Sequence, residues 1–198
     1  MKKTLVFLLS AVILLPLVSC SGTGEAPSKD ALFRTVCSAD DALERAKAAD
    51  AVVFEGMRCT SGSDVWDAFY QAVGDQTPAS VLCAHYYVLN RERMSEELYE
   101  EQKDQYPKLF FYLVEYDGSS YTVTIRQSTE ETASDPEAFA CLLHFTGAAP
   151  STATFSSYEY YVLADDPTAT WDGIMAGLLS SQFGAGYRHC TVYKNVFD

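Results

Sequence analysis

Each of the three histidines, His85, His144 and His189, lies near a cysteine in the chain, and these residue types suit metal binding or nucleophilic chemistry. Cys83 and His85 are two residues apart, and Cys141 and His144 are three apart. Thiolate and imidazole are common zinc ligands, and a thiol beside an imidazole can act as a nucleophile. In a strand, Cys83 and His85 share a face, whereas Cys141 and His144 point to opposite faces. No recognised ligand spacing is present, so we predict no metal site, with Cys83, His85 and His144 as candidates if neighbouring strands bring them together.

Other catalytic patterns are missing from the sequence. It contains no G-x-S-x-G, S-x-x-K or H-E-x-x-H motif. Glutamates concentrate at Glu96, Glu97, Glu100 and Glu101, but a general acid needs a pKa raised by burial, and such a run is typical of a solvated helix face. The sequence therefore favours a non-enzymatic role and predicts no cofactor. An envelope enzyme that uses a Cys/His pair stays as an alternative.

Tyrosine is abundant, with 13 residues, several of them in the stretch SYEYYVL. In a strand, Tyr158 and Tyr160 share one face and Tyr161 lies on the other. Tyrosines that alternate along a strand can form a stacking platform for sugar rings or a contact surface for a protein. They also favour strands simply because they cover a half-buried face. Tyr158 and Tyr160 are therefore the candidate binding residues, and packing is the competing explanation.

The N-terminus has the layout of a secretory signal peptide. Lys2 and Lys3 are followed by an apolar run from Leu5 to Val18 and then by the small residue Ser19. The run is too short for a stable membrane span, which needs about 20 apolar residues. Leu17-Val18-Ser19-Cys20 resembles the lipobox of bacterial lipoproteins. That resemblance implies cleavage after residue 19, a diacylglyceryl group on the sulfur of Cys20, and a chain anchored in the cell membrane that faces outside the cytoplasm.

Composition restricts the partners. The chain has 14 basic and 27 acidic side chains, and removal of residues 1–19 takes away only Lys2 and Lys3, so the formal charge changes from −13 to −15. Such a surface repels phosphate backbones, which disfavours nucleic-acid binding. It also repels anionic headgroups, so membrane residence is expected to depend on the lipid. The expected partners are the membrane, through the anchor, and an envelope protein or a glycan.

Five cysteines follow Cys20, at positions 37, 59, 83, 141 and 190. An odd number of thiols outside the cytosol cannot pair completely within one chain. Cys83 and Cys141 lie in apolar strand-like stretches, where cysteine acts as a small hydrophobic residue. We expect no obligatory disulfide framework and leave one or two bridges open.

Four helices are expected from apolar spacing and capping residues. The first begins near Ser38, and the second spans SGSDVWDAFYQAVGD with Ser61 or Ser63 as its cap. A third, short and acidic, covers 95–104. The fourth is capped by Thr170 and carries Trp171 on its apolar face.

Strands are expected where the apolar period changes to two. They cover 51–54, 80–89, 108–116, 121–127, 138–146, 157–163 and the final HCTVYKNVF. The run LFFYLVEY is apolar on both faces, which indicates a central strand. In the strand 121–127, Thr122, Thr124 and Arg126 should form one solvent-exposed face. The short connections predict an α+β fold with a mostly antiparallel sheet of five or six strands and the Trp66 and Trp171 helices on one face.

The expected organisation is a signal peptide over 1–19, a lipidated N-terminus and flexible tether over 20–31, and one domain over 32–198. The segments SGSDVWDAFY, YPKLFFYLVEYDG and TWDGIMAGLLSSQ resemble those of uncharacterised lipoproteins of Gram-positive anaerobes. That resemblance implies a location and no mechanism. The sequence thus predicts a lipid-anchored extracytoplasmic binding module, with an envelope enzyme or a purely structural assembly protein as alternatives.

Overall fold

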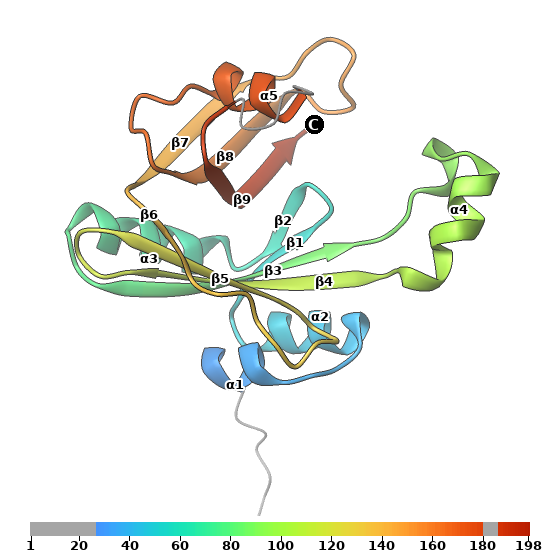
Figure 1. Ribbon diagram of the computed structural model, residues 1–198, viewed down its shortest axis with the longest axis horizontal. Helices are drawn as coiled ribbons and strands as arrows, with labels where there is room; N and C mark the ends of the chain where they lie inside the picture. Colours follow the sequence, from blue (N-terminus) through green and yellow to red (C-terminus); the bar gives the residue numbers. More distant parts are fainter. Residues whose placement is uncertain (1–26, 180–185) are drawn as a thin grey trace, which may run out of the picture.

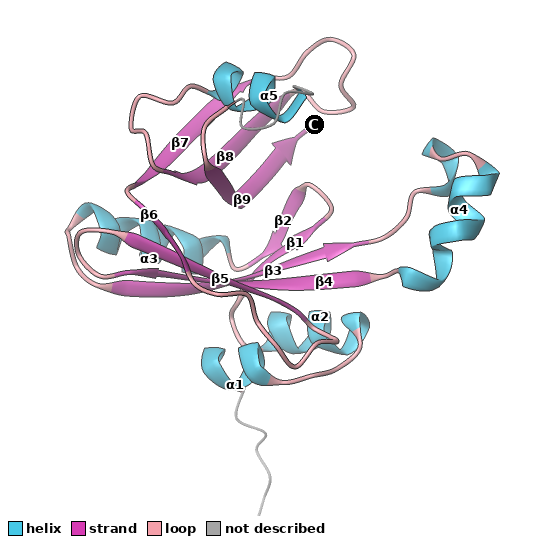
Figure 2. Cartoon of the chain, viewed as in Figure 1, coloured by secondary structure: helices cyan, strands magenta, loops and turns pink. Residues whose placement is uncertain are grey.

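A computed structural model describes residues 27–179 and 186–198 and shows an α+β fold with two β-sheets (Figures 1 and 2). The elements follow in this order: α1 (Lys29–Arg34), α2 (Ala39–Ala48), β1 (Val52–Glu55), β2 (Arg58–Ser61), α3 (Ser63–Gly74), β3 (Ala79–Tyr87), η1 (Arg91–Arg93), α4 (Glu96–Gln102), η2 (Lys103–Gln105), β4 (Lys108–Tyr116), β5 (Tyr121–Gln127), β6 (Glu137–Phe139), β7 (Cys141–Ala148), β8 (Ser157–Ala164), α5 (Trp171–Leu179) and β9 (His189–Phe197).

The large sheet has six strands in the order β2-β1-β3-β4-β5-β6, and the small sheet has three in the order β7-β8-β9. β1 and β3 are parallel, because the chain crosses over through α3 between them, and the other strand pairs are antiparallel. The large sheet is therefore mixed. The expected six-stranded, mostly antiparallel sheet was confirmed, since four of its five strand pairs are antiparallel, whereas the parallel pair β1–β3 and the separate small sheet were not predicted.

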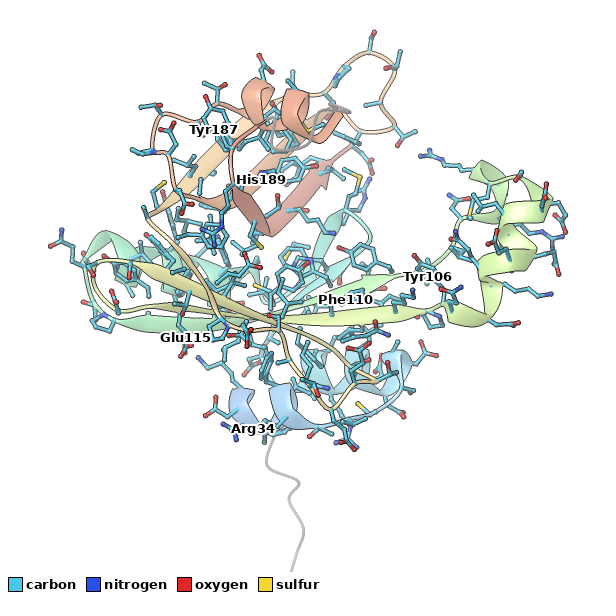
Figure 3. All side chains as sticks on the ribbon, in the orientation of Figure 1. Arg34, Tyr106, Phe110, Glu115, Tyr187 and His189 are labelled. Atoms are coloured by element: carbon cyan, nitrogen blue, oxygen red, sulfur yellow. The ribbon has the colours of Figure 1, made fainter. Side chains whose placement is uncertain are left out.

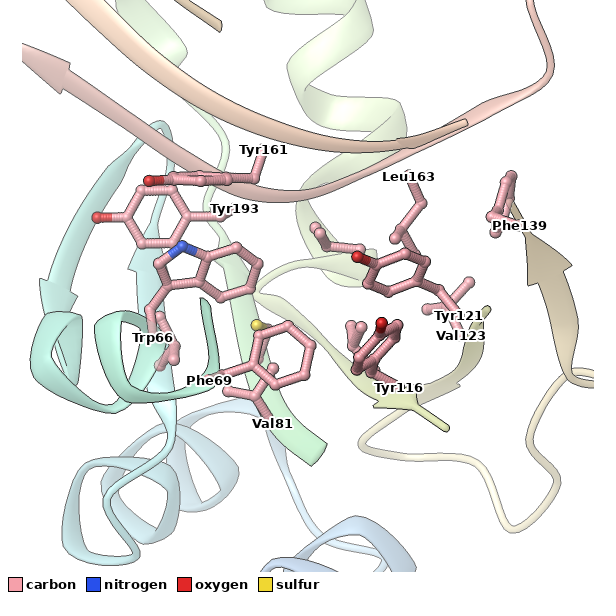
Figure 4. Close-up of a cluster of buried hydrophobic side chains, with 14 of the residues drawn as sticks. Trp66, Phe69, Val81, Tyr116, Tyr121, Val123, Phe139, Tyr161, Leu163 and Tyr193 are labelled. Atoms are coloured by element: carbon pink, nitrogen blue, oxygen red, sulfur yellow. The ribbon is translucent and has the colours of Figure 1, made fainter. Parts of the chain in front are cut away.

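The predicted helix arrangement was wrong, because the Trp66 and Trp171 helices pack on different sheets. α3 and the inner face of the small sheet cover one face of the large sheet, and α5 lies on the outer face of the small sheet. α1 and α2 cover the opposite face of the large sheet. Figure 4 shows Trp66 of α3 beside Tyr161 and Tyr193 of the small sheet, with ring centroids 5.0 and 4.9 Å away.

Helix starts agree well with the capping residues. The side chains of Ser38, Ser95 and Thr170 each accept a hydrogen bond from a backbone N–H in the first turn of α2, α4 and α5. At α3, neither predicted serine caps the helix. Gly62 does so with a left-handed φ of 75° and without a side-chain hydrogen bond. α1 begins at Lys29, so ordered structure starts inside the segment expected to be a flexible tether.

Strand predictions were confirmed at 108–116 and 121–127, with β4 at the centre of the large sheet as expected. The predicted strand 138–146 is two strands, because the chain leaves the large sheet after Phe139 and enters the small sheet at Cys141. The hairpin partner β2 was not predicted. The prediction that one face of β5 is exposed to solvent was wrong at Arg126. This side chain is 2% exposed, because α1 and residues 128–130 cover it. Across residues 27–179 and 186–198, no helix is both long and apolar enough to cross a bilayer.

Candidate binding site

An apolar groove of about 550 Å³ lies on the outer side of the small sheet. We call it the aromatic groove. Its walls come from β8, from α5, from the loop between β7 and β8, and from the turn between β1 and β2. The lining residues are Met57, Ala148, Pro150, Ala153, Phe155, Tyr158, Tyr160, Trp171, Asp172 and Met175.

The groove contains the two tyrosines that the sequence singled out, joined by a tryptophan. Tyr160 stacks on Trp171 with ring centroids 4.6 Å apart and an interplanar angle of 15°. Tyr158 lies 5.4 Å from Tyr160 and 5.5 Å from Trp171, measured between ring centroids. Tyr160 is only 7% exposed, whereas Tyr158 and Trp171 are partly exposed. The surface offered to a ligand is therefore Tyr158 and Trp171, with Tyr160 beneath them.

Local sequence explains how these rings are positioned. The period of two in β8 turns Tyr158 and Tyr160 to the outer face, while Tyr161 joins the core between the sheets. Gly147 pairs with Tyr158 across the sheet, and a β-carbon at Gly147 would lie 2.5 Å from the Tyr158 hydroxyl oxygen. Glycine therefore leaves room for the tyrosine ring to lie across β7. Trp171 follows the cap Thr170 and enters the groove from the first turn of α5.

The groove is weakly charged for such an acidic protein. Asp172 is the single charged residue among the described residues that line it, and it is exposed. Burial, and to a lesser extent the neighbouring Tyr158, raise the pKa of Tyr160, so its hydroxyl stays neutral. The formal charge of the whole chain is −13, which disfavours anionic ligands. The arrangement suits a neutral or cationic ligand with a flat apolar face and hydrogen-bonding edges.

Cys83 and His85 share a face of β3, as their spacing predicts, but both lie in the core. Cys83 is 0% and His85 2% exposed. The His85 ring stacks on Phe54 with centroids 4.5 Å apart and lies 4.4 Å from Tyr112. Burial, and then the nearby Lys194 ammonium, hold the pKa of His85 well below its usual value. The adjacent Val192 backbone acts in the opposite direction and raises the pKa of His85. Neither ring nitrogen of His85 has a partner at hydrogen-bonding distance and angle. His85 is therefore a neutral core residue.

His144 lies elsewhere, at the edge of the small sheet facing α3. Its Nε2 is 2.9 Å from Glu159 Oε1, and its ring stacks on Tyr161 with centroids 4.1 Å apart. The structure does not bring Cys83, His85 and His144 together as ligands. Within residues 27–179 and 186–198 there is no group of three or more His, Cys, Asp or Glu side chains that could hold a metal ion.

Four of the described cysteines do not provide an activated thiolate. In the described part of the chain, Cys37, Cys59, Cys83, Cys141 and Cys190 are free thiols. Burial raises the pKa of Cys59, Cys83, Cys141 and Cys190, the last to about 12, so these thiols stay protonated at neutral pH. His189 bonds through Nδ1 to the Tyr187 carbonyl, 2.8 Å away, on the segment that leads into β9 (Figure 3). Among these described groups, no thiol shares a hydrogen bond with a histidine.

Sequence reasoning found Tyr158 and Tyr160 but missed the groove's other walls. Trp171 was assigned to an apolar helix face, and Met57 and Phe155 carried no signal, because they approach the groove from loops distant in sequence. Glu96, Glu97, Glu100 and Glu101 are exposed on α4, as a solvated face requires. Cys20 lies outside the described residues. Compared with protein-family models, curated protein sequences and solved structures, the chain matches none.

Proposed function

We propose that this chain is a lipid-anchored binding module that faces outside the cytoplasm and takes a saccharide ring in its aromatic groove. The observation that carries this proposal is the groove itself, with the partly exposed rings of Tyr158 and Trp171 at its surface. The apolar face of a sugar ring stacks on aromatic side chains. Asp172 and the Tyr158 hydroxyl are placed to accept hydrogen bonds from sugar hydroxyls.

The size of the groove favours a small ligand over a protein partner. A volume of about 550 Å³ falls within the range of about 300–1,000 Å³ that is typical of small-molecule sites. A stable protein partner needs about 800 Å² of contact on each side. The large apolar side chains exposed in the described part of the chain are scattered, and only Met57 of them lines the groove. A glycan is therefore preferred to an envelope protein as the partner.

The two alternatives from the sequence have weaker support. An enzyme that uses a Cys/His pair needs a thiolate near an imidazole, and the raised thiol pKa values and the buried His85 do not supply one. A purely structural assembly protein does not need a concave aromatic site. Both alternatives are tested by the same experiments.

Binding is expected to be reported by the fluorescence of Trp171. The chain has two tryptophans, and Trp66 is 1% exposed in the core, so a groove ligand should perturb mainly Trp171. A glycan array with the full chain supplies the ligand for titration. Replacing Trp171 with alanine should weaken binding about tenfold, equivalent to ~1.4 kcal/mol, because the main stacking surface is lost. Isothermal titration calorimetry measures the affinity of this variant, because it lacks the fluorescent reporter.

Tyr99→Ala on the remote helix α4 is the matched control and should leave the affinity unchanged. If Trp171→Ala binds the ligand with unchanged affinity, the binding site lies outside the aromatic groove. If the glycan array and affinity capture of envelope proteins both stay at background, the binding-module proposal has to be abandoned.

Lipidation is expected at Cys20 alone. Metabolic labelling with a fatty acid, followed by mass spectrometry of the N-terminal peptide, should find a diacylglyceryl group on this sulfur. Cys20→Ser should abolish the label completely, because a hydroxyl is a much weaker nucleophile than a thiolate. Cys37→Ser, a change at a partly exposed cysteine of the described part of the chain, should retain the label in full. If the Cys20 sulfur of the native protein carries no lipid, the proposal that the chain is lipid-anchored is wrong.

A further inference from the structure

Lys194 of β9 is a half-buried amine at the junction of the two sheets. Its Nζ donates a hydrogen bond to the hydroxyl oxygen of Tyr87 on β3, 2.8 Å away. The same nitrogen lies 4.4 Å from the centroid of the Tyr87 ring. Lys194 and Tyr87 are both partly exposed.

No carboxylate in the described ranges pairs with this amine, although the chain is strongly acidic. Burial lowers the pKa of Lys194 to about 8. About a tenth of such an amine is neutral at pH 7, compared with less than about 0.1% of an ordinary lysine. The titratable groups on and around the neighbouring strands are His85, Tyr87, Tyr106, Lys108, Tyr112, Tyr160 and Cys190, with Lys108 opposite Tyr87 on β4.

His85, Tyr87, Tyr112 and Cys190 are uncharged near neutral pH. Burial raises the pKa of Tyr87 and Tyr112 and raises that of Cys190 to about 12, while burial and the Lys194 ammonium lower the pKa of His85. The Cys190 thiol therefore does not compete with the amine as a nucleophile. The surroundings suit a neutral reaction partner.

Aromatic rings form the floor beside the amine. Phe110 lies edge-on to Tyr87 with ring centroids 6.2 Å apart, and Tyr112 is its neighbour on the same face of β4. Figure 3 shows Phe110 on the large sheet, with Tyr106 at the end of the strand toward α4. Phe110 and Tyr112 are partly exposed. This floor favours an apolar or aromatic reagent over a charged one.

We propose that Lys194 is a capture site for small uncharged aldehydes. The lone pair of the neutral amine adds to the carbonyl carbon, and the carbonyl oxygen takes up a proton to give a carbinolamine. Loss of water then leaves an imine between Lys194 and the aldehyde carbon, with no change in oxidation state. The Tyr87 hydroxyl touches the reacting nitrogen and can carry a proton to or from it.

The test is competitive labelling of the full chain with benzaldehyde, trapped by cyanoborohydride and mapped by peptide mass spectrometry. At pH 7.5, Lys194 should be labelled about tenfold faster than Lys29, which is also partly exposed, because a larger neutral fraction outweighs the lower basicity of the Lys194 amine. The labelling rate of Lys194 should level off above about pH 8, because its amine is then mostly neutral. Equal or slower labelling of Lys194, whether through charge or through poor access, overturns the proposal.

Two tyrosine variants test the local geometry. Tyr87→Phe removes the acceptor that stabilises the ammonium, so the labelling midpoint of Lys194 should move to lower pH. Tyr112→Phe keeps the aromatic floor and removes a hydroxyl that is not bonded to Lys194, so the midpoint should stay in place. An unchanged or raised midpoint in Tyr87→Phe would contradict the role assigned to that hydroxyl.

Discussion

Replacing Arg126 with methionine is expected to lower the free energy of unfolding by about 3–5 kcal/mol, because the carbonyls of Phe33, Thr35 and Glu130 lose this donor together. The guanidinium donates to the backbone carbonyls of Phe33, Thr35, Gln127, Ser128 and Glu130. It also lies 5.7 and 5.6 Å from the ring centroids of Phe33 and Phe111. A single side chain thus holds α1 and the segment after β5 against the large sheet.

Urea unfolding followed by far-UV circular dichroism measures this loss. Arg34→Met, which removes an exposed arginine from the same helix region, is the matched control and should change stability by less than about 0.5 kcal/mol. Arg126→Lys should recover part of the loss, since one ammonium cannot reach all five carbonyls. A loss below about 1 kcal/mol in Arg126→Met would mean that water satisfies these carbonyls after the change.

Replacing Gly62 with alanine is expected to lower the free energy of unfolding by about 3 kcal/mol or more. The residue has a φ of 75°, which costs about 1–2 kcal/mol for a residue with a β-carbon. The added atom would also lie 2.4 Å from the Ala51 carbonyl oxygen, and this contact is with backbone, which cannot rotate away. Relief requires moving the start of α3 away from β1.

Gly56→Ala separates these two contributions. Gly56 has a similar φ of 65°, but nothing lies within 4 Å of a β-carbon there. Gly56→Ala should therefore lower the free energy of unfolding only by the cost of the left-handed backbone conformation, about 1–2 kcal/mol. The difference between the two variants, measured by thermal or urea unfolding, isolates the close approach of α3 and β1. Equal losses would show that the helix start moves freely.

Sequence patterns predicted correctly those features of the structure that depend on residues close together in the chain. Ser38, Ser95 and Thr170 cap helices because their hydroxyls bond to backbone only two or three residues away. β4 was predicted to the residue, because a run that is apolar on both faces can be stable only at the centre of a sheet.

The alternation of apolar and polar residues along a strand could not show which other elements cover each face of that strand. Arg126 alternates with apolar residues in β5, so it was assigned to solvent, but α1 reaches over it from about ninety residues earlier in the chain. The run 138–146 keeps its apolar character where the chain changes sheets, so nothing local marked the switch at Ala140. The parallel pairing of β1 with β3 likewise depends on a crossover that includes a helix.

The candidate site divides in the same way. The sequence by itself determined that Tyr158 and Tyr160 share a face, because strand geometry alternates side chains. Only the tertiary structure decided that this face meets Trp171 and Met57 in a groove and that Lys194 reaches Tyr87, because these contacts join elements distant in sequence. Such contacts depend on how two sheets pack, and packing depends on the shape and burial of many side chains together rather than on any local pattern.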